Sequence, residues 1–162
     1  MARVLIVGCG ARGRALASAL VAEGHAVRGT TRDRATVAAI EAAGAEAVVA
    51  DPDRLSTLVG RLEGVSVLCW LMGSADGEPE AVAALHGPRL GSLLETLVDT
   101  PVRGVVYEAA GRVAADVLEQ GAEQVRRATQ THHMRAGVVD VDPDDRRAWL
   151  AATLAAVDGV LS

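Results

Sequence analysis

A glycine-rich segment near the N-terminus constrains the fold of this chain more than any other feature. Gly8, Gly10 and Gly13 form a G-x-G-x-x-G pattern directly after the apolar run 3–7 and directly before the helical pattern 11–23. In such a strand-turn-helix context the first glycine permits a tight turn, the second lets backbone approach a pyrophosphate, and the third lets helix and strand pack closely. The free N–H groups of the first helical turn favour an anion. The pattern therefore predicts a dinucleotide-binding turn.

Apolar strand-like runs alternate with helical patterns along the whole chain, as parallel βαβ units require. The expected strands are residues 3–7, 26–31, 45–50, 65–71, 103–107 and 135–141. The expected helices are residues 11–23, 35–43, 53–62, 88–98, 112–131 with a break allowed at Gly121, and a last one from about 142 to 161. Residues 73–87 are expected to form a loop with at most one helical turn. The order predicts an α/β fold: a doubly wound parallel (Rossmann) sheet of about six strands.

Composition bounds the size and the class of the protein. A chain of 162 residues that is 50% hydrophobic can bury one core, so we expect one domain over residues 1–162 without a substrate domain. All 16 basic residues are arginine, which excludes lysine-dependent catalysis. A net charge of −5 with dispersed arginines argues against nucleic acid as a partner. The first strand begins near residue 3 and no apolar run reaches membrane-span length, so we expect no signal peptide, no membrane partner and a cytoplasmic location.

Several residues that could bind metal or form a disulfide have simpler interpretations. Cys9 and Cys69 lie in predicted strands or strand ends, which favours two reduced, buried thiols over a disulfide or metal pair. His132 and His133 are adjacent in sequence and cannot share a helix face, so we expect surface loop residues. The acids near the last helix are expected to be a cap and first-turn acids, without a metal: Asp140, Asp142, Asp144 and Asp145.

The end of the second expected strand bears on the choice of cofactor. NAD-preferring sites usually carry Asp or Glu there to bind the ribose hydroxyls, whereas this chain has Thr31 followed by Arg32. A guanidinium can pair with a 2′-phosphate, which favours NADP, with NAD as the alternative. Two other interpretations stay open. Arg32 can be a solvated residue at a strand end, and Asp33 can reach the ribose if the register differs by two residues.

Beyond the glycine turn the chain resembles a known family. The segments that carry the resemblance are Gly24-His25-Ala26-Val27-Arg28, Arg32-Asp33, Gly44-Ala45-Glu46, Asp51 and Leu62-Glu63-Gly64-Val65. Together they resemble the atypical extended short-chain dehydrogenase/reductases, especially the NmrA-like NAD(P)-binding group, over residues 3 to about 111. The resemblance implies that the glycine turn holds the pyrophosphate, that Arg32 lies by the adenosine ribose or its phosphate, and that Asp51 lies near the adenine. It also implies that the loop 71–73 runs beneath the nicotinamide half.

These arguments give one set of expected cofactor-binding residues: Gly8, Gly10, Ala11, Arg12, Gly13, Thr31, Arg32, Asp51, Leu71, Met72 and Gly73. The glycine pattern itself departs from the family, because most extended members have G-x-x-G-x-x-G. Some atypical members share the shorter form.

The catalytic pattern of the family is missing. Its enzymes use a tyrosine with a lysine four residues later, which lowers the pKa of the tyrosine and binds the ribose. The only tyrosine, Tyr107, lies inside an expected strand and no lysine follows it, so it is expected to be a packed aromatic side chain. Catalytically active relatives carry Ser or Thr at about the position of Ala110. We therefore assign no catalytic residue.

Two function classes remain open, with a third behind them. The first is a regulatory NADP(H)-binding or redox-sensing module. The second is an NAD(P)H-dependent oxidoreductase or epimerase-like enzyme acting on a small molecule, with proton transfer from His86, Glu108 or water, because hydride transfer needs few protein groups. The third is a ligand-sensing Rossmann domain that gates ion transport, which normally has an acidic end to its second strand.

A homodimer is also expected. Apolar stripes recur at helical spacing on the expected helices 88–98 and 112–131. Their members are Leu90, Leu93, Leu94 and Leu97 on the first helix, and Val113, Val117 and Leu118 on the second. One stripe must cover the sheet, and the residues left on the outer edges of these helices would pair two subunits.

Overall fold

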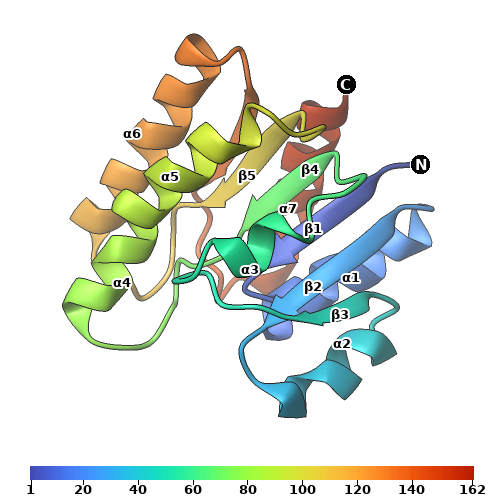
Figure 1. Ribbon diagram of the computed structural model, residues 1–162. Helices are drawn as coiled ribbons and strands as arrows, with labels where there is room; N and C mark the ends of the chain where they lie inside the picture. Colours follow the sequence, from blue (N-terminus) through green and yellow to red (C-terminus); the bar gives the residue numbers. More distant parts are fainter.

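Six short, largely apolar strands form one parallel sheet in the computed structural model, which describes residues 1–162 (Figure 1). The strands are β1 (Arg3–Val7), β2 (Ala26–Thr31), β3 (Glu46–Val49), β4 (Val67–Trp70), β5 (Gly104–Glu108) and β6 (Arg135–Val139). Their order in the sheet is β3-β2-β1-β4-β5-β6. The direction of winding changes between β1 and β4, and in such sheets ligands bind at the carboxyl ends of the two strands that meet there.

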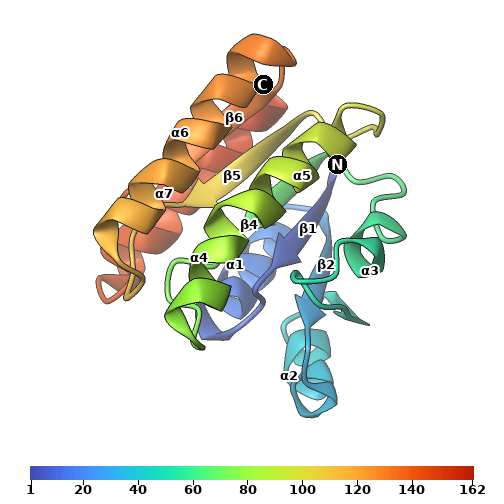
Figure 2. The same cartoon turned by 60° about the vertical axis from the view of Figure 1, so that its left-hand side comes forward.

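Helices cover both faces of the sheet, which confirms the predicted doubly wound Rossmann fold (Figure 2). One face carries α1 (Ala11–Ala22), α2 (Val37–Ala42), which follows the short helix η1 (Arg34–Thr36), and α7 (Arg146–Leu161). The other face carries α3 (Ser56–Val59), α4 (Pro79–His86), α5 (Pro88–Leu97) and α6 (Ala115–Thr131). No helix is both long enough and apolar enough to cross a membrane.

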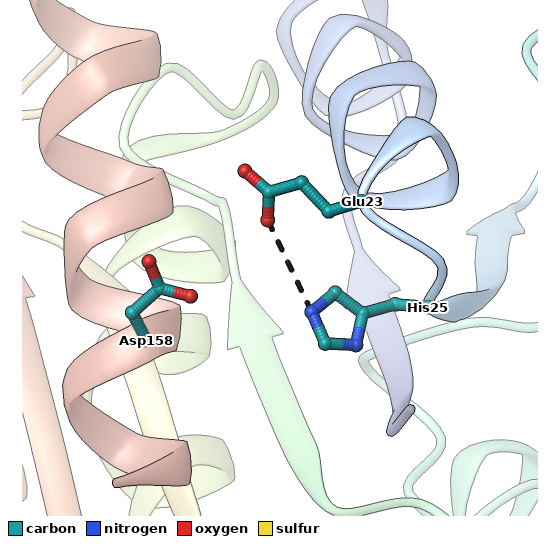
Figure 3. Close-up of side chains that lie close together, drawn as sticks. All are labelled: Glu23, His25 and Asp158. Atoms are coloured by element: carbon teal, nitrogen blue, oxygen red, sulfur yellow. Dashed lines mark ion pairs between the residues drawn. The ribbon is translucent and has the colours of Figure 1, made fainter.

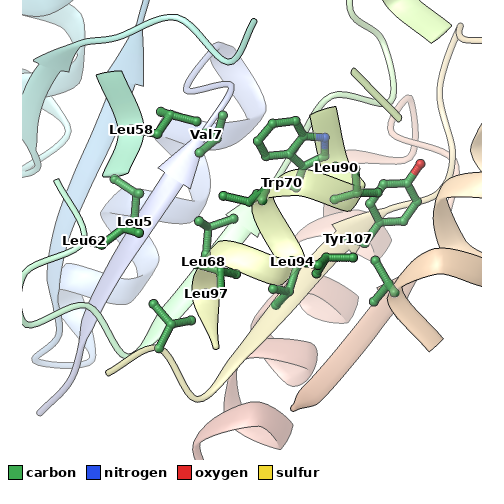
Figure 4. Close-up of a cluster of buried hydrophobic side chains, with 14 of the residues drawn as sticks. Leu5, Val7, Leu58, Leu62, Leu68, Trp70, Leu90, Leu94, Leu97 and Tyr107 are labelled. Carbon is green, nitrogen blue, oxygen red and sulfur yellow. The ribbon is translucent and has the colours of Figure 1, made fainter. Parts of the chain in front are cut away.

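The central strand β4 shows how the sequence divides between the two cores. Val67 and Cys69 point to the α1 and α7 face, whereas Leu68 and Trp70 point to the α5 and α6 face. All four are fully buried, so the unbroken apolar run of this strand is explained by cover on both sides. Figure 4 shows the second of these cores, where Leu90 and other leucines of α5 pack against β4 and β5.

The segment 73–87 differs from its prediction as a loop. It contains α4, whose first residue is Pro79 and whose buried face consists of Val82, Leu85 and His86. Proline suits the first position of a helix because an N–H at that position would have no hydrogen-bond acceptor within the helix. The Gly, Ser and Asp residues that precede α4 dominate the composition of the segment. For this reason the composition predicted a loop, although the second half of the segment forms a helix of eight residues.

Three other predicted helices have different bounds in the structure, and the one predicted over residues 53–62 is the short helix α3, Ser56–Val59. The helix predicted to begin at residue 112 begins at Ala115 and passes unbroken through Gly121, where a Cβ would overlap the Tyr107 hydroxyl. The last helix begins only at Arg146, because Asp145 is its cap and accepts a hydrogen bond from the Ala148 N–H at 3.2 Å. The preceding acids therefore lie in a turn before the helix rather than in its first turn.

Candidate functional site

The glycine turn after β1 is shaped by close backbone packing below it and open space above it. Gly8 has φ of +88°, and a Cβ there would lie 2.5 Å from the Leu71 carbonyl oxygen. A Cβ on Gly13 would lie 3.0 Å from the Gly8 carbonyl oxygen, so helix and strand touch at this point. By contrast, nothing lies within 4 Å of the Cβ position of Gly10. The space above Gly10 is what an approaching pyrophosphate requires.

The first turn of α1 faces this space with unsatisfied donors. The N–H groups of Ala11, Arg12 and Gly13 have no acceptor in the protein, and no side chain caps the helix at Gly10. Unpartnered N–H groups and the helix dipole both stabilise an anion here. The turn thus fits the pyrophosphate of a dinucleotide on an observation independent of the glycine spacing.

A cavity of about 350 Å³ lies over this turn at the carboxyl ends of β1, β2 and β4. Most of the predicted cofactor-binding residues line it: Gly8, Gly10, Ala11, Arg12, Gly13, Thr31, Arg32, Leu71 and Met72. Sequence reasoning missed the other lining residues: Cys9, Arg14, Thr30, Thr36, Ala50, Pro52, Ser74, Ala75 and Arg112. Most of these are neighbours of predicted residues. Arg112 is different, since it follows β5 and no local pattern marked it.

The end of β2 presents one free cation to the cavity. The Thr31 hydroxyl accepts a hydrogen bond from the Asp33 N–H at 3.0 Å. The Asp33 carboxylate caps η1 by accepting from the Ala35 N–H at 2.9 Å. Arg32 is exposed and forms no ion pair or side-chain hydrogen bond. Its guanidinium is available to a ligand, whereas the Asp33 carboxylate is engaged in the turn.

Two of the predicted residues do not line the cavity. Asp51 lies between the lining residues Ala50 and Pro52, and its carboxylate accepts from the Asp53 N–H at 2.9 Å in a local turn. Gly73 is buried below Met72, where a Cβ would overlap the Ala110 carbonyl oxygen. The structure therefore puts the backbone of Gly73 into the protein interior and puts Met72 at the surface of the cavity.

An ion pair between the partly exposed Arg12 and a buried carboxylate ties the glycine turn to β5. Arg12 donates two hydrogen bonds from Nη2 to Glu108, at 2.9 and 3.0 Å, and one from Nε at 3.1 Å. The Glu108 side chain is fully buried and also accepts from the Gly73 N–H at 2.8 Å. Arg12 further lies over the Trp149 ring, 5.6 Å from its centroid. The Arg12 side chain is thus engaged by Glu108 and Trp149, whereas its backbone N–H has no acceptor in the protein.

The loops that follow β4 and β5 are fastened to each other. The Val113 N–H donates to the Gly73 carbonyl at 3.0 Å, and the Arg112 N–H donates to the Ser74 hydroxyl at 3.2 Å. The Arg112 guanidinium reaches the Ser74 carbonyl and pairs with Asp76 at 3.3 Å. These contacts close the edge of the sheet beyond β4, on the side where the loop 71–73 is expected to approach a nicotinamide.

The histidine and tyrosine nearest the cavity form a closed network. His86 Nε2 lies 3.0 Å from the Met72 carbonyl, and Nδ1 lies 2.6 Å from the Tyr107 hydroxyl. The tautomer that satisfies both has Nε2–H donating to Met72 and the Tyr107 O–H donating to Nδ1. Burial lowers the pKa of His86, against smaller raising effects of the Met72 carbonyl and Glu108. Burial and the Glu108 charge both raise the pKa of Tyr107. Neither group lines the cavity, and both stay neutral near pH 7.

Burial favours the neutral thiol form of both cysteines. Both are free and buried, as predicted. Burial raises the pKa of Cys9 to about 11, although the charge of Arg14 lowers it. Burial raises the pKa of Cys69 to about 12. Cys9 lines the cavity as a neutral group and does not supply a nucleophile there.

At the opposite edge of the sheet, Glu23, His25 and Asp158 bring three ligand-type atoms together (Figure 3). His25 Nε2 lies 4.0 Å from Glu23 Oε2. However, His25 Nδ1 accepts a hydrogen bond from the Ala2 N–H at 3.1 Å. A neutral histidine that accepts through Nδ1 carries its proton on Nε2, which is the atom that a metal would need. The arrangement is that of a histidine donor facing carboxylates.

Comparison with known proteins addresses the family and the fold. The family model of the TrkA-N domain matches residues 4–86, which include the glycine turn and the loop after β4. No curated protein matches the chain. The NmrA-like group expected from the sequence is not the family that matches, so that finer assignment stays a prediction.

Solved structures share the fold at low identity. A short-chain dehydrogenase/reductase superfamily protein from Agrobacterium tumefaciens with bound NAD has a TM-score of 0.70 and 20% identity, covering 84% of this chain and 48% of its own. A putative NAD-dependent epimerase/dehydratase from Bacillus halodurans has a TM-score of 0.70 and 15% identity, covering 85% and 69%. The Citrobacter sp. triphenylmethane reductase complexed with NADP(H) has a TM-score of 0.64 and 15% identity, covering 85% and 48%. The chain spans about half the length of the first and third of these proteins.

Proposed function

The chain belongs to the TrkA-N domain family of NAD(P)-binding Rossmann domains, and on that premise we propose that it is an NADP(H)-binding module that senses cofactor without transforming a substrate. The observation that carries the binding proposal is the first turn of α1, where three unpartnered N–H groups face a cavity above Gly10. In this proposal the turn 8–13 holds the pyrophosphate, and Leu71 and Met72 support the nicotinamide half.

The preference for NADP rests on the end of β2. Arg32 borders the cavity without a partner, and no free carboxylate stands beside it, since Asp33 caps η1. A guanidinium pairs favourably with a 2′-phosphate, whereas a ribose with two free hydroxyls offers it no charge. NAD is the alternative cofactor, and the solved relatives include proteins with either one.

The proposal of binding without catalysis rests on the state of the titratable groups. A bound nicotinamide supplies or accepts a hydride, and reduction of a carbonyl needs a proton donor beside it. His86 and Tyr107 satisfy each other below the cavity, and Glu108 is held by Arg12 and the Gly73 N–H. These contacts leave water as the remaining proton source for the oxidoreductase alternative.

Calorimetric titration with NADPH, NADP⁺, NADH and NAD⁺ tests the proposed binding of a dinucleotide and the proposed preference for NADP. We expect saturable binding of one dinucleotide per chain, with the phosphorylated forms tighter by about tenfold or more. A screen with simple carbonyl substrates should leave NADPH unoxidised. Absence of any dinucleotide binding would refute the proposal, and turnover in the screen would replace the sensing role with the oxidoreductase one.

The homodimer remains a proposal, but most of the apolar residues expected to form its interface are not available on the surface. The stripe Leu90, Leu93, Leu94 and Leu97 is buried in the protein's own core, and so is Leu118. Val113 and Val117 are only half-buried, so they are the members of the predicted stripes that remain for an interface. Light scattering at micromolar concentration, with and without NADPH, decides it: a monomer up to tens of micromolar refutes the dimer.

A further inference from the structure

A second hollow lies on the α1 and α7 side of the nucleotide cavity, and the proposed function gives it no role. It measures about 310 Å³, and its apolar lining comes from Ala11 and Ala15 of α1 and from Trp149 and Leu150 of α7. Small-molecule sites are typically concave, mostly apolar and of this size or larger. The Trp149 side chain is only 1% exposed, and its indole N–H has no acceptor in the protein.

Three arginines complete the lining of this hollow: Arg12, Arg146 and Arg147. Arg146 and Arg147 are exposed, and neither takes part in an ion pair. They occupy the first turn of α7, where the helix dipole disfavours cations. Two unpaired guanidinium groups at an unfavourable helix end leave a positive charge beside an apolar surface.

The neighbouring acids do not neutralise this charge by direct pairing. Asp145 caps α7 through the Ala148 N–H, and Asp142 accepts from the Asp144 N–H at 2.9 Å. These two carboxylates and that of Asp144 keep their negative charge, but none of the three forms an ion pair with Arg146 or Arg147. On a chain whose net charge is −5, an apolar hollow bordered by unpaired arginines is complementary to an anion with an apolar body.

We propose that this hollow, the α1–α7 pocket, binds a small carboxylate with an aliphatic or aromatic body. The body packs on Ala15, Leu150 and the Trp149 side chain, and the carboxylate pairs with Arg146 and Arg147. A guanidinium suits a carboxylate because two N–H groups can donate to its two oxygens. Ala11 and Arg12 line both this pocket and the nucleotide cavity, so the first turn of α1 is common to both sites.

Octanoate is the probe, titrated calorimetrically into the whole chain without nucleotide. We expect one saturable site, with octanol at least tenfold weaker and octylamine without binding. The double variant Arg146→Gln/Arg147→Gln should weaken octanoate at least tenfold. Ala15→Trp should abolish binding by filling the pocket, and its far-UV circular dichroism should match that of the parent chain because Ala15 is exposed.

The matched control is Arg61→Gln/Arg127→Gln, which removes the same charge from exposed arginines outside the pocket. It should leave octanoate affinity unchanged. Equal weakening by this pair, equal binding of octylamine, or no saturable binding would each overturn the proposal. Self-association that Ala15→Trp abolishes would assign the hollow to a second copy of the chain and overturn it too. None of these results depends on nucleotide, so the proposed function is tested separately.

Discussion

The two halves of the carboxyl edge of the sheet are built in opposite ways. Around β1 and β2, the N–H groups of the first turn of α1 and the guanidinium of Arg32 have no partner within the protein. Around β4 and β5, His86, Tyr107 and Glu108 are buried and each has a partner. One half keeps its polar groups available to a ligand, and the other uses them to hold the fold.

This contrast means that the groups available to bind a ligand and the buried titratable groups lie in different halves of the edge. Groups left unpaired in an open cavity cost little there because water can satisfy them, and a ligand can replace that water. Groups paired in the interior are costly to disturb, since a buried charge without its partner loses its compensation. The β1–β2 half therefore suits recognition. The β4–β5 half acts as a rigid support for the glycine turn, through Arg12.

The largest expected effect breaks the closed half at Arg12. Arg12→Ala should lower the free energy of unfolding by about 3 kcal/mol, because it leaves a fully buried Glu108 carboxylate with the Gly73 N–H as its remaining donor. Glu108→Gln should cost less, about 1–2 kcal/mol, since the partly exposed Arg12 can then turn toward water. Urea unfolding at pH 7 measures both.

The control for this pair is Arg112→Ala. Arg112 and Asp76 are 73% and 87% exposed, so the loss of their ion pair should cost less than about 1 kcal/mol. Equal effects of Arg12→Ala and Arg112→Ala would mean that the buried pair does not support the glycine turn.

The next effect tests the two halves against each other with a pair of glycine variants. Gly73→Ala should cost about 2–3 kcal/mol in stability, because its methyl group would overlap the Ala110 carbonyl and push the two loops apart. Gly10→Val should leave the fold intact, since the Cβ position is open, but should block NADPH and NADH alike by filling the approach to the backbone. Unfolding midpoints and calorimetric titrations together give the readout. Normal binding by a folded Gly10→Val protein would reduce the glycine pattern to a structural turn.

The comparison also explains what the sequence could and could not predict. The glycine turn, the strands and the residues that follow them were predictable because each depends on a few neighbouring residues. Arg32 could be placed at the end of β2 for the same reason. In contrast, Arg12 and Glu108 are 96 residues apart, and His86 and Tyr107 are 21 apart. No local pattern connects either pair.

Two positions near the predicted site show the same limit. The family resemblance implies that the loop 71–73 runs beneath the nicotinamide half, and in the structure Gly73 packs closely on Ala110, a contact that no local pattern predicts. His86 was expected on a loop that could approach the cofactor. It lies instead on the buried face of α4, a helix that the glycines and acids before Pro79 concealed.

A smaller expected effect sharpens the open half. Arg32→Ala should weaken NADPH binding by about 1.5–3 kcal/mol, the range for a charge-assisted hydrogen bond, and leave NADH nearly unchanged. Stability should not change, because Arg32 is exposed and makes no contact that its loss would break. Arg34→Ala, next to the site and equally exposed, is the matched control and should spare both cofactors. An equal loss for NADPH and NADH would refute the assignment of Arg32 to a 2′-phosphate.

The smallest expected effect is the acid sensitivity of the closed half. Burial lowers the pKa of His86 below its ordinary value of 6.5, so the unfolded chain takes up the proton first as the pH falls. The stability due to the neutral His86–Tyr107 pair is therefore fully present above about pH 7 and is lost through 6.5 and below, with a slope of at most about 1.4 kcal/mol per pH unit.

His86→Phe should remove this pH dependence of stability while lowering stability at every pH, because the Tyr107 hydroxyl keeps only its long contact with the Leu118 carbonyl, at 3.5 Å. Urea unfolding from about pH 7.5 to about pH 5 measures the slopes. An unchanged slope in His86→Phe would mean that His86 takes up its proton without disturbing the fold, and the β4–β5 half would then be less rigid than its closed hydrogen bonds indicate.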